Sequence, residues 1–176
     1  FKFVLVNRLA FILKIIKNFL QEEDFLRIQK VLLNSNFPWF YNSGVVNDLD
    51  CVNNFQFTHT FYADNLVCSN YFNLIKPIVD NIKLLSILSI KANLLTRTNL
   101  NVEHGFHTDY VNQKNVTTGI FYVNDNNGYT KFKNGEISTS EKNKFIEFNS
   151  TNSHTGSSCT DENIRVIINF NYIKPE

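Results

Sequence analysis

His107 and Asp109 have the residue types and the spacing for metal chemistry. In an extended segment, residues two apart point the same way, so an imidazole and a carboxylate would lie together here. His154 supplies a second imidazole later in the chain. Two histidines and one carboxylate leave other coordination positions open, which suits non-haem Fe(II). We expect His107, Asp109 and His154 to bind one iron ion; no cysteines have the short spacing of a structural zinc site.

Arg165 lies on a segment, residues 163–173, that alternates between polar and apolar positions as a strand does. Its predicted face also carries Ile167, Asn169 and Asn171, while the other face is apolar. A buried, unpaired guanidinium is costly, so Arg165 needs an anionic partner. The planar group matches a carboxylate through two parallel hydrogen bonds, and we expect Arg165 to bind one beside the metal.

These residues and their surroundings resemble a known family over about residues 90–173. The resemblance includes the segments Asn93–Leu95, Phe121–Asn124, Gly128–Phe132 and Asn143–Phe148. Together with the metal motif and Arg165, they look like the 2-oxoglutarate- and Fe(II)-dependent dioxygenases, most closely their prolyl 4-hydroxylase-like branch. The interval from His154 to Arg165 is slightly longer than in some members, so we expect the intervening turn to differ from theirs.

The resemblance implies a chemistry and a set of roles. Fe(II) on His107, Asp109 and His154 would bind the co-substrate 2-oxoglutarate, whose far carboxylate Arg165 and Tyr122 would anchor. With O2, and ascorbate as a candidate reductant, the enzyme would hydroxylate an unactivated C–H bond and release succinate and CO2. The carboxylate of Asp109 argues against a halogenase, which lacks it to make room for halide.

The substrate is less defined. The family branch favours a prolyl or similar residue of a peptide or protein. The segment Pro38–Asp50 and the turn 111–116, with Trp39, Tyr41, Tyr110 and Asn112, are expected to flank the barrel mouth, although these aromatic residues could equally belong to the core. The alternatives are the same chemistry on a small metabolite or nucleobase, and a non-catalytic cupin-like barrel that binds a metal or ligand.

The composition limits the kinds of partner that the protein is expected to bind. The chain has 176 residues and a formal net charge of +1, so it offers no electrostatic reason to expect nucleic acid or an anionic membrane as partner. No uncharged run in residues 1–20 approaches the ~18 residues that span a bilayer. The three scattered cysteines favour a reducing, cytoplasmic compartment. Cys159 lies near His154 in sequence, but we expect a simple thiol there.

The pattern predicts an α+β, mainly β fold: a double-stranded β-helix, or jelly-roll, cupin-like barrel supported by N-terminal helices. We expect a single dioxygenase domain, with helical support over about 1–85 and the barrel core over about 86–174. We expect His59 to be structural. His104 could support the metal site or face the substrate, but we expect an exposed loop residue. The predicted helices are 22–34 and 70–84, with Pro77 causing a kink or a late start in the second. The predicted strands are 11–16, 53–62, 87–98, 105–111, 116–123, 128–133, 144–149, 152–157 and 163–173.

Overall fold

The computed structural model describes residues 11–44, 55–111, 113 and 115–175. Over these ranges the helices are α1 (Glu22–Leu32) and α2 (Phe72–Asn81). The strands are β1 (Lys14–Ile16), β2 (Phe40–Asn42), β3 (Gln56–Ala63), β4 (Leu66–Val67), β5 (Ser86–Thr96), β6 (Val116–Tyr122), β7 (Asn126–Phe132), β8 (Ile137–Ser140), β9 (Lys144–Asn149), β10 (His154–Gly156) and β11 (Ile164–Ile173).

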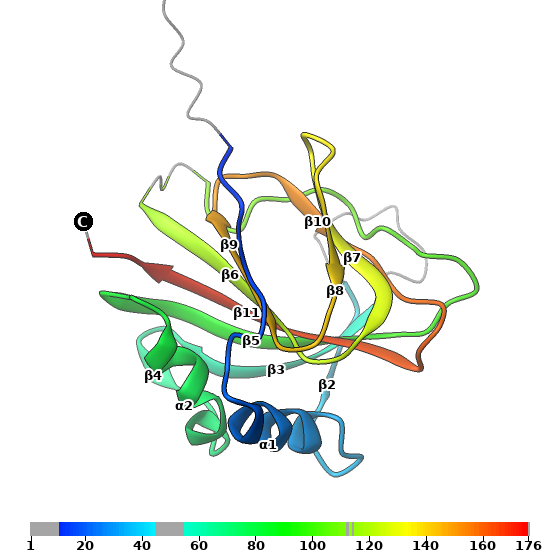
Figure 1. The fold of residues 1–176 in the computed structure, drawn as a ribbon, viewed down its shortest axis with the longest axis horizontal. Coiled ribbons are helices and arrows are strands. Elements are labelled where there is room, and N and C mark those ends of the chain that lie inside the picture. Colours follow the sequence, from blue (N-terminus) through cyan, green and yellow to red (C-terminus); the bar gives the residue numbers. More distant parts are fainter. Residues whose placement is uncertain (1–10, 45–54, 112, 114, 176) are drawn as a thin grey trace, which may run out of the picture.

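The strands form two antiparallel sheets. The large, eight-stranded sheet has the order β1-β9-β6-β11-β5-β3-β2, with β4 paired to β3, and the small sheet has the order β10-β7-β8. Figure 1 shows α1 and α2 below the large sheet and the small sheet over its other side. This arrangement is a double-stranded β-helix supported by helices, so the predicted fold class is confirmed.

The alternation of β11 separates the structural core from the cavity. Val166, Ile168 and Phe170 point into the apolar cluster that the large sheet forms with the helices. Arg165, Ile167 and Asn169 instead line a cavity between the sheets. The alternation in the sequence therefore separated the core-facing from the cavity-facing residues of this strand correctly.

Both helices begin and end inside their predicted ranges. Three acidic residues occupy the first turn of α1, where the helix dipole favours negative charge, and Phe25, Ile28 and Leu32 are buried. Helix α2 begins only at Phe72 and contains Pro77, as the expectation of a late start allowed. Pro77 has no N–H to donate within the helix, and tertiary packing of buried Ile75 and Ile78 stabilises it nevertheless.

The predicted strand 105–111 is wrong. Only single backbone pairings form here, between Glu103 and Ser157 and between His107 and His154. Gly105 adopts a positive φ of 87°, which interrupts an extended conformation. The prediction also omitted β4 and β8, which are short and lack a strong apolar alternation.

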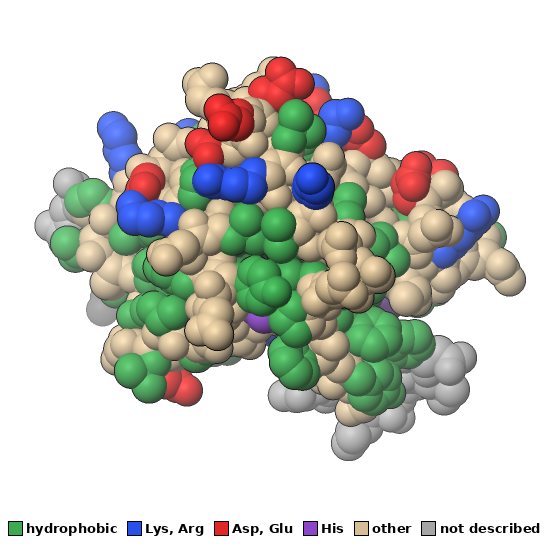
Figure 2. Space-filling model, turned by 90° about the horizontal axis from the view of Figure 1, so that it is seen from below, with side chains coloured by type: hydrophobic (Ala, Val, Ile, Leu, Met, Phe, Trp, Pro, Cys, Tyr) green, Lys and Arg blue, Asp and Glu red, His purple; other side chains and the backbone are tan. Residues whose placement is uncertain are grey.

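The edge strands carry exposed apolar side chains, including Phe40 and Tyr41 on β2 and Leu66 and Val67 on β4. Figure 2 shows hydrophobic side chains gathered on one part of the face seen from below, with charged side chains along another. No helix in the described part of the chain is long and apolar enough to cross a membrane.

Candidate functional site

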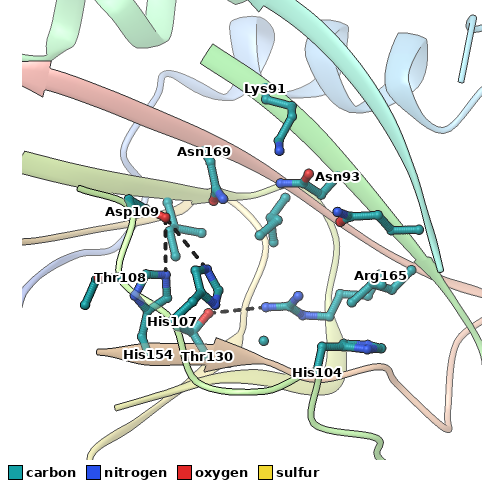
Figure 3. A pocket seen from close by; sticks show the side chains of 15 residues that line it. Lys91, Asn93, His104, His107, Thr108, Asp109, Thr130, His154, Arg165 and Asn169 are labelled. Carbon is teal, nitrogen blue, oxygen red and sulfur yellow. Dashed lines mark hydrogen bonds and ion pairs between the residues drawn. The ribbon is translucent and has the colours of Figure 1, made fainter. Parts of the chain in front are cut away.

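A cavity of about 250 Å³ opens between the two sheets. Its lining comes from β3, β5, β6 and β11 on the large sheet, from β7 and β10 on the small sheet, and from the segment that carries His107 and Asp109. Figure 3 shows the polar side chains of these elements pointing into this space. The cavity therefore contains His107, Asp109 and His154, singled out for metal binding, and Arg165, singled out for carboxylate binding, but not Tyr122.

His107, Asp109 and His154 converge at one end of the cavity. Asp109 Oδ1 lies 3.7 Å from His107 Nε2 and 4.0 Å from His154 Nε2. The candidate ligand atoms of the three residues all lie within 4.8 Å of one another. The backbones of His107 and His154 exchange two hydrogen bonds of 2.9 Å, which hold the two imidazoles side by side. One divalent ion could therefore contact all three side chains.

The hydrogen bonds of the imidazoles prepare them as ligands. His154 Nδ1 lies 3.1 Å from the carbonyl oxygen of Asn152, and His107 Nδ1 lies 3.4 Å from that of Gly105. A carbonyl only accepts, so we assign the proton of each neutral ring to Nδ1. Each Nε2 then presents a lone pair toward Asp109, as neutral histidine ligands require.

Burial favours the neutral form of His154. Its side chain is 3% exposed and packs beside the rings of Phe132 and Phe148. Desolvation lowers the pKa of His154, the negative charge of Asp109 partly opposes this shift, and the neighbouring His107 adds to it. The imidazole is therefore kept unprotonated and ready to coordinate a metal.

Thr118 on β6 orients the carboxylate. Its hydroxyl lies 2.6 Å from Asp109 Oδ2 and 2.9 Å from Asn171 Oδ1. Because one hydroxyl has one proton, we assign the donated bond to the closer, charged oxygen of Asp109. Oδ1 of Asp109 remains directed at the histidines. The chemistry of this donor set fits an Fe(II) ion.

Arg165 lies in the same cavity and is 2% exposed. Its Nε donates to Ser140 Oγ at 2.8 Å, its Nη2 donates to Thr130 Oγ1 at 3.3 Å, and its guanidinium carbon lies 5.8 Å from the centre of the Tyr122 ring. No carboxylate among the described residues pairs with it. Burial lowers the pKa of Arg165, although a guanidinium remains charged in proteins. Among the described residues, the partners of this buried cation are therefore two hydroxyl groups and an aromatic ring.

Tyr122 lies behind this arginine and does not line the cavity. Its hydroxyl is fully buried, 3.0 Å from Thr130 Oγ1 and 3.3 Å from the carbonyl oxygen of Ser138. Burial raises the pKa of Tyr122. Thr130 does line the cavity, so the link from Tyr122 to a ligand runs through Thr130 here.

The expectation for His104 is wrong. It is 5% exposed and lines the cavity, because the pairings at Glu103 and His107 hold this segment against β10. Desolvation lowers the pKa of His104 to about 4, and the charge of Arg165 contributes. The lining residues that were not singled out as site residues include Gln56, Lys91, Asn93 and Thr130, although Lys91 and Asn93 lie two apart on one face of β5.

Several other expected positions lie away from the cavity. Trp39 packs against Phe37, with ring centroids 5.1 Å apart, and Tyr41 is exposed on β2. His59 is buried between hydrogen bonds to Pro38 O and Ser69 Oγ, as expected of a structural histidine. Cys159 is buried and is not part of the metal group. Residues 45–50 and Asn112 lie outside the described residues.

Comparison with known proteins supports the fold at low sequence identity. No family model matches the chain, and no curated protein matches it. An oxidoreductase of the 2OG-Fe(II) oxygenase family from Burkholderia pseudomallei is similar with a TM-score of 0.65 and 10% identity, covering 91% of this chain and 84% of that one. A Trichoplax adhaerens prolyl hydroxylase, solved in complex with a hypoxia inducible factor peptide fragment, gives a TM-score of 0.64 and 14% identity over 92% and 83%. A Pseudomonas putida prolyl-4-hydroxylase gives 0.60 and 10% over 94% of both chains. At such identities the likeness shows the shared fold.

Proposed function

We propose that this protein is an Fe(II)- and 2-oxoglutarate-dependent dioxygenase that hydroxylates an unactivated C–H bond and releases succinate and CO2. The observation that carries the proposal is the presence of two features in one cavity: the His107, Asp109 and His154 group, and the buried Arg165. A metal site alone would suit many proteins. A buried cation beside it, without a carboxylate from the described residues, calls for an anionic co-substrate.

In this proposal His107, Asp109 and His154 hold the iron, which when bound would supply the activation of dioxygen. The chain's own contribution is to keep the ligands oriented. The carbonyl oxygens of Gly105 and Asn152 accept hydrogen bonds from the Nδ1–H groups of His107 and His154.

Arg165 would bind the far carboxylate of 2-oxoglutarate. Ser140 and Thr130 fix the guanidinium through its Nε and Nη2 atoms. Tyr122 belongs to the same site in this proposal, because its hydroxyl holds Thr130 Oγ1 against the arginine. This role is more indirect than the hydrogen bond to the co-substrate that the resemblance implied.

For the primary substrate we propose an amino-acid residue. Prolyl hydroxylases among the structural neighbours, one of them solved with a peptide fragment, favour this class over a nucleobase. The chain would act as one catalytic domain.

Succinate formation tests the function. The purified chain, incubated with Fe(II), 2-oxoglutarate, ascorbate and O2, should form succinate, and omitting either iron or O2 should stop it. Arg165→Ala should raise the KM for 2-oxoglutarate strongly, while Arg27→Ala, an exposed arginine on α1, should not. The rival, a non-catalytic cupin-like barrel, predicts metal binding without succinate under any of these conditions.

A further inference from the structure

Several polar side chains in the cavity are used neither by the metal group nor by the arginine site, and three of them lie together. They are Lys91 and Asn93 on β5 and Asn169 on β11. Lys91 is paired directly opposite Asn169, and Asn93 is the next residue on the same face of β5. Directly opposed residues have Cβ atoms about 5 Å apart, so the three side chains form one polar group. Figure 3 shows them on the large-sheet side of the cavity.

The two amides are unusual because the described part of the chain offers no hydrogen-bond partner to the oxygen of either side chain. Asn93 is 7% exposed, and the Oδ1 atoms of both Asn93 and Asn169 are buried without a partner. With the amide orientations of the structure, neither Oδ1 has a donor within hydrogen-bonding distance among the described residues. Buried amides are normally satisfied, so these two are suited to a ligand that both donates and accepts.

The co-substrate cannot satisfy them. The dianion of 2-oxoglutarate carries only acceptor oxygens, so it offers no N–H or O–H to an amide oxygen. A second molecule with donor groups would complete Asn93 and Asn169. In a cavity that also holds the candidate metal group, that molecule is the primary substrate.

Lys91 adds a requirement for negative charge. No carboxylate among the described residues pairs with it, and Asp109 is the one acidic residue in the cavity lining. The lining therefore has two fixed cations, Lys91 and Arg165, against one carboxylate. Adding Fe(II) and the 2-oxoglutarate dianion leaves one net positive charge, which one further carboxylate would neutralise.

We propose that Lys91, Asn93 and Asn169 form the binding subsite for the primary substrate, and that this substrate carries a carboxylate beside an N–H donor. Lys91 binds the carboxylate of the substrate, and the two amide oxygens accept hydrogen bonds from its N–H group. This inference rests on the proposed function. The required chemistry is that of a free amino acid or of the C-terminal residue of a peptide.

A nucleobase fits less well, although it too combines donors and acceptors. Enzymes that act on bases hold them by stacking against aromatic or apolar side chains. Apart from the imidazoles of His104, His107 and His154, the described residues of the cavity lining include no aromatic ring.

Anaerobic calorimetric titration of the full chain, loaded with Fe(II) and 2-oxoglutarate, tests the subsite. The probes are free L-amino acids, a tripeptide library with free C-termini, and the same library with C-terminal carboxamides. We expect binding of free amino acids or of free C-termini, and at least about tenfold weaker binding of the matched carboxamides. The first two probe sets distinguish the two sources of the carboxylate.

Substitutions give the controls. Lys91→Gln should remove the preference for carboxylate over carboxamide, whereas Lys83→Gln, on an exposed lysine outside the cavity, should leave it intact. Asn93→Leu should lower the affinity of every probe that binds the unsubstituted chain by about tenfold. Unchanged 2-oxoglutarate affinity would show that the variants remain folded.

Equal affinity for carboxylates and carboxamides, an unchanged preference in Lys91→Gln, or no binding by any carboxylate probe would overturn the subsite. Each of these results leaves the proposed function standing if 2-oxoglutarate still binds to the Fe(II)-loaded chain. Failure of 2-oxoglutarate itself to bind would instead refute the proposed function.

Discussion

At the scale of single residues, the metal group depends on neighbours that are not ligands. Thr118 is fully buried on β6, and its hydroxyl holds Asp109 Oδ2 at 2.6 Å. Without that bond the carboxylate could rotate away from the histidines.

We predict that Thr118→Val, which keeps the side-chain shape, weakens Fe(II) affinity by about 10–100-fold. Anaerobic metal titration measures this, with Thr117→Val on the other face of β6 as control. Equal affinities in the two variants would show that Thr118 does not position Asp109.

His104 makes stability depend on pH. Its pKa is lowered to about 4 in the folded protein from 6.5, so the unfolded chain takes up a proton at higher pH than the folded chain does. Stability is therefore full above pH 6.5 and falls as the pH decreases from 6.5 to 4. For His104 alone the loss from pH 7 to pH 5 is roughly 2 kcal/mol.

We predict that His104→Gln reduces the pH dependence of unfolding by about this amount in the metal-free protein. Urea unfolding at pH 7, 6 and 5 provides the measurement. The remaining histidines contribute to both proteins, so the difference between the two slopes isolates His104. Identical slopes would contradict a buried, neutral His104.

Residue types and spacing were sufficient to identify the group His107, Asp109 and His154, and to place Arg165 in the same cavity. They were not sufficient for His104, because nothing in a polar segment indicates that two single backbone pairings hold it against β10. The sequence did not predict that Lys91 and Asn93 line the cavity, for a related reason. A polar residue in a strand normally faces solvent, and only the second sheet turns this face into a cavity lining.

At the scale of elements, β7 approaches Arg165 too closely for a side chain at Gly128. A Cβ there would lie 2.5 Å from Arg165 Cδ and 2.9 Å from the backbone oxygen of Ser158. A Cβ at Gly156 on β10 would meet Arg165 Nη1 at 3.6 Å, an ordinary contact. The two glycines therefore form a matched pair beside one arginine.

We predict that Gly128→Ala destabilises the fold by about 1–3 kcal/mol and weakens 2-oxoglutarate binding, because Arg165 must move. Gly156→Ala should change both much less. Denaturant unfolding and 2-oxoglutarate titration measure the two effects. Similar behaviour of the two variants would mean that β7 does not determine the position of the arginine.

Regular elements were predicted from pattern where the alternation was strong, as in β11 and β9. The segment 105–111 failed because a pattern of residue types does not reveal the positive φ of Gly105. The short strands β4 and β8 form through pairing with β3 and β7, a tertiary effect without a local signal.

At the scale of the whole molecule, the helices and the cavity lie on opposite sides of the large sheet. Ile78 on α2 is fully buried in the cluster between helices and sheet and does not line the cavity. The stability of the fold and the chemistry of the site should therefore respond separately to substitution.

We predict that Ile78→Ala lowers the free energy of unfolding by about 2–5 kcal/mol, because it leaves a void in a close-packed core. At temperatures where the variant remains folded, its Fe(II) affinity should match that of the unsubstituted chain. Urea unfolding and metal titration test the two halves of this prediction. A parallel loss of metal affinity would show that the helical side and the site are coupled.

The most direct test of the central claim is an anaerobic absorption titration of the Fe(II)-loaded chain with 2-oxoglutarate. We predict a weak visible charge-transfer band that saturates near one 2-oxoglutarate per chain. It should vanish in the His107→Ala/His154→Ala double variant and require much higher 2-oxoglutarate in Arg165→Ala. A chain that binds Fe(II) but shows no band, or a double variant that shows the band unchanged, would contradict the assignment of this cavity.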